Sequence, residues 1–189
     1  YGAQLAVDAL TLDVAAGTAL ALLGPNGSGK TTSLKVAAGL VRPTTGRVSV
    51  GEPPRDVRLP DARRLTSFLP QKLAVPDTLT GLEVARFYGA LREVRDDRIA
   101  DALRAVSLNG AGARAVGTYS GGMVQRLGLA VAMLPDAPLM LLDEPTAALD
   151  PDGLSAFYAL VDRHKADGRT LVFTSHQLGD VERLADRIA

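Results

Sequence analysis

The chain of 189 residues contains no cysteine, so disulfides and thiolate metal sites are excluded. It also lacks an excess of either charge, because 21 acidic residues balance the 21 basic ones. A surface that follows nucleic-acid phosphates usually shows a basic excess, and we therefore expect no nucleic-acid partner. No apolar run approaches the roughly 20 residues of a membrane span, and the first residues show no signal-peptide pattern. A role at a membrane would therefore need another polypeptide or segment.

The clearest positive signal is a glycine-rich loop between an apolar run and a helical pattern. It fits G-x-x-x-x-G-K-[ST] and reads Gly24-Pro25-Asn26-Gly27-Ser28-Gly29-Lys30-Thr31. The N–H groups of such a loop wrap a phosphate, and the following helix adds its positive N-terminus. Lys30 would reach the outer phosphates, and the Thr31 hydroxyl would ligate Mg²⁺. A chance match to the four fixed positions is expected in under about 1% of chains this size, so the loop predicts a nucleotide site.

Two carboxylates, Asp143 and Glu144, follow the apolar run of residues 139–142. At the carboxyl end of a strand they lie where ligands bind in parallel sheets. Asp143 would hold Mg²⁺, and Glu144 would polarise the attacking water. An acidic turn or helix cap is the alternative, which the P-loop makes the weaker interpretation.

A second phosphate-sized site is predicted at Tyr119-Ser120-Gly121-Gly122-Met123. Ser120 would cap a helix there, while the two glycines expose their N–H groups and form an anion nest. Taken alone, Ser-Gly-Gly is more often only a helix start.

Three isolated residues depend on these motifs for their interpretation. By itself, Gln71 would be an exposed loop residue. His176 follows a predicted strand, where a lone histidine more often makes structural hydrogen bonds than catalyses a reaction. His164 lies between Arg163 and Lys165, and we expect it at the surface of a helix.

Short apolar runs alternate with helical patterns, which predicts an α/β fold with a mostly parallel sheet covered on both faces. Strands are expected at residues 5–14, 19–23, 47–50, 139–142 and 170–174. Helices are expected at residues 31–38, 82–92, 96–106, 120–134, 151–167 and 177–187. Helical patterns dominate residues 73–134, which we interpret as an inserted α-helical subdomain. The ends of the chain interrupt this alternation, so we expect a segment of a longer protein without its terminal strands.

In this order, the motifs resemble those of the ATP-binding-cassette (ABC) ATPase family over essentially the whole chain. The matches are Gly24–Thr31 with Walker A, Gln71 with the Q-loop, Tyr119–Met123 with the signature motif, Leu139–Glu144 with Walker B, Ala147–Asp150 with the D-loop and His176 with the switch histidine. The resemblance implies one ABC ATPase domain over residues 1–189. Its P-loop NTPase (RecA-like) core would be residues 1–72 and 135–189, and its helical subdomain residues 73–134.

The resemblance also implies a role for each matched residue. ATP would be bound by Tyr1, which lies at the place of the adenine-stacking aromatic, and by Gly24, Asn26, Gly27, Ser28, Gly29, Lys30, Thr31 and Thr32. The ATP of a partner subunit would be contacted by Ser120, Gly121, Gly122 and Asp150. Glu144 would be the general base, assisted by His176 and Gln71. Mg²⁺ would be held by Thr31, Gln71 and Asp143.

The implied function is the ATP-binding subunit of a transporter. It would hydrolyse MgATP in a head-to-tail dimer, most simply a homodimer, and drive a transmembrane permease subunit. Its place would be the cytoplasm, at the inner face of the cell membrane. The usual signature is L-S-G-G-Q, and the form with Tyr119 and Met123 is similar to that of ABC-2-type bacterial exporters. Residues 118–129 and the segment after Asp150 are similar to the ATPase of the copper-processing transporter that serves nitrous oxide reductase.

Two alternatives come from other classes. A soluble ABC protein, such as a translation factor or a DNA-repair ATPase, would share these motifs. The 90 residues between Lys30 and Ser120 leave no room for the long coiled coil of the repair type, whereas a translation factor stays open. A GTP-dependent switch would need a guanine-reading sequence similar to N-K-x-D, which is absent.

Overall fold

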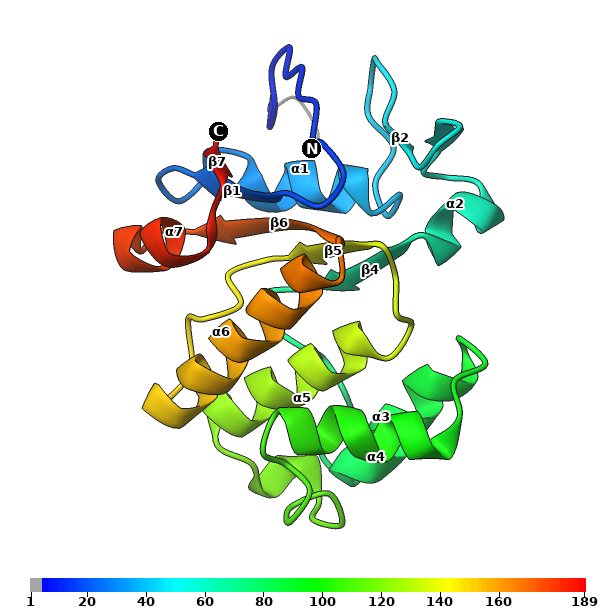
Figure 1. Cartoon of the computed structure of the whole chain (residues 1–189), viewed down its shortest axis with the longest axis vertical. Helices are drawn as coiled ribbons and strands as arrows, with labels where there is room; N and C mark the ends of the chain where they lie inside the picture. The colour runs from blue at the N-terminus through cyan, green and yellow to red at the C-terminus, as the bar shows by residue number, and fades with distance from the viewer. Residues whose placement is uncertain (1–4) are drawn as a thin grey trace. The chain divides into compact units, whose positions relative to one another are not determined.

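The structure, a computed structural model, describes residues 5–189, so the predicted adenine-stacking residue Tyr1 lies outside the described residues. Its strands are β1 (Ala19–Leu23), β2 (Ser49–Val50), β3 (Arg55–Asp56), β4 (Thr66–Leu69), β5 (Leu139–Leu142), β6 (Thr170–Ser175) and β7 (Arg187–Ile188) (Figure 1). Its helices are α1 (Lys30–Ala37), α2 (Pro60–Arg64), α3 (Gly81–Ala90), α4 (Asp96–Ala105), the short 3-10 helix η1 (Val116–Thr118), α5 (Gly121–Met133), α6 (Pro151–Ala166) and α7 (Leu178–Leu184).

The chain falls into two compact units, each assembled from separated stretches of sequence. The first comprises residues 5–68, 137–144 and 164–189 and is built on the main sheet. The second comprises residues 69–136 and 145–163 and contains α3, α4, α5 and most of α6. Residues 145–163, which we expected in the sheet core, therefore group with the helical residues.

The sheet of the first unit has five strands in the order β4-β5-β6-β1-β7. Strand β6 pairs in parallel with both β1 and β5, and β7 pairs in parallel with β1. Strands β1, β5 and β6 are short apolar runs that are almost wholly buried, as in parallel sheets covered on both faces. The predicted parallel sheet is confirmed. Because parallel strands end at the same edge, the chain segments that follow β1, β5 and β6 meet there.

Helix α1 is held on this sheet by apolar packing (Figure 1). Its Leu34, together with Ala38 just beyond the helix, packs in one cluster with Leu20, Leu22, Leu141 and Val172. Full burial of one leucine stabilises a fold by about 1.5–3 kcal/mol, so this cluster fixes the start of α1 relative to the end of β1. The glycine-rich loop that joins them is therefore attached to two fixed elements.

The other end of β1 is anchored by Asp186. Its Oδ2 accepts the backbone N–H of Ala19 at 2.8 Å, and its Oδ1 accepts a hydrogen bond from Lys165 Nζ at 2.7 Å. The hydrogen bond from the Lys165 ammonium holds the pKa of Asp186 below its usual range. The carboxylate therefore stays ionised at neutral pH and keeps β1 in place at its first residue.

Three expectations about the first unit are wrong. The helix expected at residues 177–187 is shorter, because α7 ends at Leu184 and Arg187 belongs to strand β7. Residues 5–14 form no strand, because most of the stretch is exposed and only Leu12 and Val14 pack against the core cluster. His164, expected at the surface, is 7% exposed. The reason is that the end of α6 turns back toward β6, which brings His164 Nε2 to 3.2 Å from the carbonyl oxygen of Thr170.

The second unit is a cluster of three mutually packed helices, α3, α4 and α5. The helices predicted at residues 82–92, 96–106 and 120–134 are confirmed, with ends that differ by one or two residues. Helix α3 begins with a capping box in which Thr80 Oγ1 accepts the Glu83 N–H at 3.2 Å. In return, Glu83 Oε2 accepts the Thr80 N–H at 2.8 Å, so the N–H groups of Thr80 and Glu83 are both satisfied.

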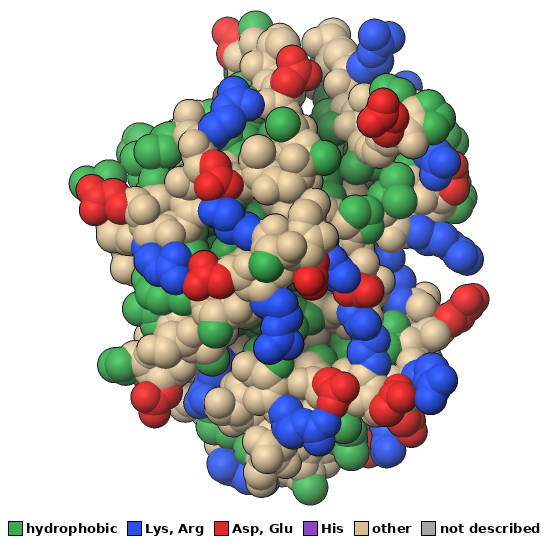
Figure 2. Space-filling view, viewed as in Figure 1, with side chains coloured by type: hydrophobic (Ala, Val, Ile, Leu, Met, Phe, Trp, Pro, Cys, Tyr) green, Lys and Arg blue, Asp and Glu red, His purple; other side chains and the backbone are tan. Residues whose placement is uncertain are grey.

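The surface shows mixed charge on the face drawn in Figure 2, where basic and acidic side chains are interspersed without forming one large patch. This distribution agrees with the balanced composition of the sequence. Across residues 5–189, no helix combines the length and the apolar character that crossing a bilayer requires.

Candidate active site

The glycine-rich loop joins the end of β1 to the start of α1, as the sequence predicted. Gly27 and Gly29 adopt φ angles of 83° and 89°, in the left-handed region that glycine tolerates best. A side chain on Gly29 would also collide with the carbonyl oxygen of Ala6. Gly29 is the N-cap of α1, so the positive N-terminal end of the helix faces into the loop. This backbone has the form that binds a phosphate group.

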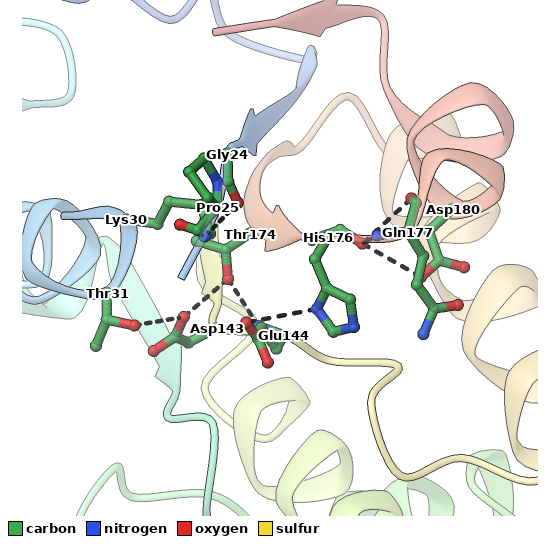
Figure 3. Close-up of polar contacts among 11 residues, drawn as sticks. Gly24, Pro25, Lys30, Thr31, Asp143, Glu144, Thr174, His176, Gln177 and Asp180 are labelled. Carbon is green, nitrogen blue, oxygen red and sulfur yellow. Dashed lines mark hydrogen bonds and ion pairs between the residues drawn. The ribbon is translucent and has the colours of Figure 1, made fainter. Parts of the chain in front are cut away.

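All the predicted phosphate-binding residues of the first unit lie on this loop or on the first turn of α1. Lys30 Nζ donates to the carbonyl oxygens of Gly24, at 2.7 Å, and Pro25, at 2.9 Å (Figure 3). These bonds hold the ammonium group across the mouth of the loop. A phosphate oxygen would be a stronger partner than either carbonyl, because both partners would then be charged.

A buried carboxylate faces the start of α1 from the end of β5. Asp143 is 1% exposed, and its Oδ1 accepts a hydrogen bond from Thr31 Oγ1 at 3.1 Å. The same oxygen accepts a second hydrogen bond, from Thr174 Oγ1, at 2.8 Å. Carboxylate and hydroxyl oxygens are the ligands that Mg²⁺ prefers, so the Thr31 and Asp143 donor set fits this ion.

Glu144 lies beside Asp143 and has an unusual backbone. Its φ is 48°, in the left-handed region, and its N–H donates to Thr174 Oγ1 at 2.8 Å. The side chain is only 13% exposed, and Oε1 lies 3.6 Å from His176 Nδ1 (Figure 3). The two predicted catalytic groups, Glu144 and His176, are therefore neighbours at the same edge of the sheet as Lys30.

The loop that carries His176 is tied down on its other side. Ser175 is buried, and its Oγ accepts the N–H of Gln177 at 3.0 Å and lies 3.5 Å from Asp180 Oδ2. Gln177 is the N-cap of α7, so the loop is held between β6 and α7. This leaves the His176 ring half exposed, facing Glu144.

Thr174 was not among the predicted site residues, although it is hydrogen-bonded to two of them, Asp143 and Glu144. A signal for it was present in the sequence. β5 and β6 were both predicted strands, and a hydroxyl residue follows the apolar run of the second just as Asp143 follows that of the first. The register pairs Leu142 with Phe173, which places Thr174 alongside Asp143.

The second predicted phosphate site lies in the second unit, at the start of α5. Ser120 is the N-cap, and its Oγ accepts the N–H of Met123 at 3.2 Å. Gly121 is exposed, and a Cβ there would meet no atom within 4 Å. A Cβ on Gly122 would lie 2.9 Å from the carbonyl oxygen of Ala148. The first glycine thus leaves open space for a ligand, and the second allows the D-loop to approach α5 closely.

Helix α5 also contacts Pro145 ahead of the D-loop and Asp150 at its end, which agrees with the grouping of residues 145–163 with the helices. The buried Gln125 side chain donates from Nε2 to the carbonyl oxygen of Pro145 at 3.0 Å. Asp150 caps α6 by accepting the Gly153 N–H at 2.9 Å, and it lies 3.8 Å from a guanidinium nitrogen of Arg126. Ser120, Gly122 and Asp150 therefore belong to one packed part of the second unit.

Gln71, predicted to act in catalysis and to bind Mg²⁺, also belongs to the second unit. It lies two residues after β4 and is exposed. The predicted residues are thus divided between the two units: Lys30, Asp143, Glu144 and His176 lie in the first, and Gln71 and the start of α5 lie in the second.

Tyr119, one of the two departures from the usual signature, is fastened inside the second unit. Its phenol donates to the carbonyl oxygen of Ala111 at 2.8 Å. Burial raises the pKa of this phenol, so it remains a protonated donor at neutral pH. A Cβ on Gly81 would overlap the phenol oxygen, which means that Tyr119 is accommodated because residue 81 is glycine.

The Gly81→Ala variant is therefore expected to lose about 1–3 kcal/mol of stability, the usual cost of overpacking. In the Gly81→Ala/Tyr119→Leu double variant the phenol is absent, so the penalty of the alanine should shrink by at least about 1 kcal/mol. Urea unfolding of the two single variants and the double variant measures this coupling.

Gly110→Ala is the matched control, because a Cβ at Gly110 would meet no atom within 4 Å. It should change stability by less than about 0.5 kcal/mol. Penalties that simply add in the double variant would show that the phenol does not explain the glycine.

A model of the family described as ABC transporter matches residues 7–147. The chain is 38% identical over 193 residues to the ABC transporter ATP-binding protein YxlF of Bacillus subtilis, covering 100% of this chain and 63% of the relative. It is 35% identical over 192 residues to the Nod factor export ATP-binding protein I of Burkholderia orbicola, with coverage of 100% and 63%. It is 38% identical over 197 residues to the daunorubicin resistance ATP-binding protein DrrA2 of Streptomyces coeruleorubidus, with coverage of 100% and 60%. The chain thus spans less than two thirds of the length of these relatives.

Solved structures give the same picture. The dimeric structure of the bacterial ABC transporter cassette MJ0796 matches with a TM-score of 0.87 and 27% identity, covering 100% of this chain and 88% of that chain. A post-hydrolysis dimer of the same cassette, bound to ADP and Pi, matches with a TM-score of 0.83 and 28% identity, covering 94% and 82%. The predicted fold class, an α/β P-loop NTPase fold, is confirmed.

Proposed function

The chain belongs to the ABC transporter family, and from that premise we propose that it binds and hydrolyses MgATP to drive transport by a membrane permease. One observation carries the proposal. Within the first unit, the glycine-rich loop, the Thr31–Asp143 pair and the Glu144–His176 pair meet at one edge of a parallel sheet. A phosphate cradle, oxygen ligands for Mg²⁺ and a carboxylate base are the parts that ATP hydrolysis requires.

ATP binding is proposed to use the loop from Gly24 to Lys30 and the first turn of α1. The backbone N–H groups would surround the β-phosphate, and Lys30 would exchange its carbonyl partners for phosphate oxygens. Thr32 would contact the α-phosphate. Tyr1 remains predicted to stack on adenine.

Mg²⁺ is proposed to bind to the Thr31 hydroxyl and the Asp143 carboxylate, with Gln71 as a further ligand. When bound, the ion neutralises charge on the β- and γ-phosphates. Thr31 and Asp143 already lie 3.1 Å apart, so little rearrangement of this chain is needed.

For hydrolysis, we propose that Glu144 accepts a proton from a water molecule while the oxygen of that water attacks the γ-phosphorus. The bond from that phosphorus to the bridging oxygen of ADP then breaks, which releases ADP and inorganic phosphate. His176 would hold the γ-phosphate and the water. Its ring lies 3.6 Å from Glu144, so the base and the orienting group act on the same small volume.

A head-to-tail homodimer is proposed as the active state. Ser120, Gly121, Gly122 and Asp150 would reach the ATP bound by the partner copy. The similar cassette MJ0796 has a dimeric structure, which supports a dimer by analogy. The transporter would place the chain on the cytoplasmic face of the membrane, against its permease.

The direction of transport is proposed to be export. Two relatives are named for Nod factor export and daunorubicin resistance, which agrees with the exporter-type signature. None of the relatives named above concerns copper, so the similarity to the copper-processing ATPase receives no support and we propose no substrate from it. The soluble ABC ATPase considered above receives no support from these relatives, which are named as transporter, export or resistance ATP-binding proteins. Co-purification of the full-length protein with a multi-span membrane protein that stimulates its ATPase activity tests the transport function.

The dimer makes a prediction about kinetics. If each ATP site needs residues from two copies, the specific activity of the full-length protein should rise with protein concentration and level off once the dimer dominates. At low concentration the total rate should approach a second-order dependence. Phosphate release measured over a 100-fold dilution series, alongside sedimentation of the same samples, tests this. Constant specific activity in samples that sediment as monomers would refute the shared site.

A further inference from the structure

We propose that Thr174 is a positioning residue for ATP hydrolysis, which sets the two carboxylates of the site through one buried hydroxyl. The proposal rests on the proposed ATPase function. Thr174 donates to Asp143 Oδ1 at 2.8 Å and accepts the backbone N–H of Glu144 at 2.8 Å (Figure 3). It thereby connects the expected Mg²⁺ ligand to the expected general base from a neighbouring strand.

The position of Thr174 is one that an apolar residue would normally occupy. It lies in β6, between β1 and β5 in the sheet, and its side chain belongs to a residue that is 0% exposed. Valine has nearly the same shape and suits a buried parallel strand. A buried hydroxyl costs stability unless it is hydrogen-bonded, and here its donor and acceptor functions are both used. The hydroxyl is therefore explained by what it binds.

The hydrogen bond that Thr174 accepts fixes Glu144. A non-glycine residue in the left-handed region carries a local conformational cost and persists only where its surroundings hold it. The N–H of Glu144 has such a hold in Thr174 Oγ1. With its backbone set in this way, the Glu144 side chain points toward His176 (Figure 3).

The hydrogen bond that Thr174 donates fixes Asp143. Two hydroxyl groups, those of Thr31 and Thr174, donate to the same carboxylate oxygen. The Thr31 hydroxyl is also the proposed cation ligand, so the geometry of its bond to Asp143 would follow the cation. Thr174, on the adjacent strand β6, has no proposed cation to bind, so its bond would hold the carboxylate in its orientation. Thr174 itself has no contact with a reacting atom in this scheme.

The test compares Thr174→Val with Thr174→Ser in the full-length protein. Valine keeps the shape and removes both hydrogen bonds, and a misplacement of the base by about 1 Å costs up to about 100-fold in rate. We expect kcat to fall about 10- to 100-fold while the KM for MgATP changes less than about 3-fold. Serine restores the hydroxyl and should recover most of kcat.

Thr170→Val is the matched control, because it makes the same change at the other end of β6. The Thr170 hydroxyl accepts the Gly17 N–H at 3.0 Å, so its loss affects a turn and not the carboxylates. This variant should keep kcat within about 2-fold of the wild type. A general loss of sheet stability would lower the activity of both valine variants, whereas the positioning role lowers only one.

A second measurement keeps the proposal testable without turnover. In Thr174→Val, amide hydrogen exchange at Glu144 should become at least about 10-fold faster. Exchange at Val172, which lies on β6 with Thr174, should stay protected. Unchanged kcat together with unchanged Glu144 exchange would overturn the positioning role. An inactive wild-type protein whose Glu144 exchange still responds to the substitution would instead overturn the ATPase function and leave the structural link in place.

Discussion

Replacing Glu144 by glutamine is expected to lower ATP turnover at least about 100-fold and to leave ATP binding intact, because a general base contributes that much or more. The amide keeps the size of the carboxylate but cannot accept a proton from water. The phosphate cradle around Lys30 and the Thr31–Asp143 pair are unchanged by the substitution. ATP should therefore remain bound and hold two copies together.

The measurement is steady-state phosphate release beside retention of radiolabelled ATP on a sizing column. The Glu144→Gln variant should elute as a dimer with ATP, and the wild type should not retain it. Glu182→Gln is the control, since Glu182 is an exposed residue of α7. It should behave as the wild type. A Glu144→Gln rate within about 3-fold of the wild type would remove Glu144 from the role of base.

The arrangement of the first site was predictable because parallel strands gather their carboxyl ends. The sequence places a glycine-rich loop after one buried run and Asp143-Glu144 after another. Any parallel sheet that contains both runs brings them to one edge. Thr31 and Asp143, both expected to hold Mg²⁺, accordingly lie close together, with Thr31 Oγ1 at 3.1 Å from Asp143 Oδ1. Charged and glycine-rich motifs are informative in sequence because they are costly to place without a ligand.

The contribution of Thr174 was harder to predict, since a threonine in a strand is ordinary in composition. Its meaning depends on the register that sets it beside Asp143, and register is a property of the folded sheet. The grouping of residues 145–163 with the helices depends in the same way on a tertiary bond, that from Gln125 to Pro145. The buried position of His164 follows from the turn between α6 and β6. The charged neighbours Arg163 and Lys165 instead suggest an exposed position.

The strand expected at residues 5–14 failed for a related reason. An alternation of apolar and polar residues predicts a strand only if one face is covered. Within the described residues, Leu5 and Leu10 are largely exposed, while Leu12 and Val14 alone pack on the core cluster. Periodicity was therefore a weaker guide here than the buried runs that formed β1, β5 and β6.

Ser120→Asp is expected to lower turnover about 100-fold or more, because a like charge placed against a phosphate costs several kcal/mol. Ser120 is the N-cap of α5, and aspartate is as good an N-cap as serine, so α5 should be unaffected. The loss would then come from repulsion of a partner's ATP. Ser120→Asn is the matched control, since it has the same size, also caps helices and carries no charge; its rate should stay within about 10-fold of the wild type.

A mixture of two inactive variants distinguishes a shared site from a self-contained one. Lys30→Ala removes the charge proposed to bind ATP in its own copy, and Ser120→Asp disrupts the proposed contact with the partner's ATP. In a head-to-tail dimer of one copy of each, one site receives an intact glycine-rich loop from the Ser120→Asp copy and an intact Ser120 from the Lys30→Ala copy. Equal amounts should then recover about a quarter of the wild-type rate, since half of the dimers are mixed and each has one sound site. If Ser120 served only its own copy, no combination would contain a sound site, and the mixture would stay as inactive as its components.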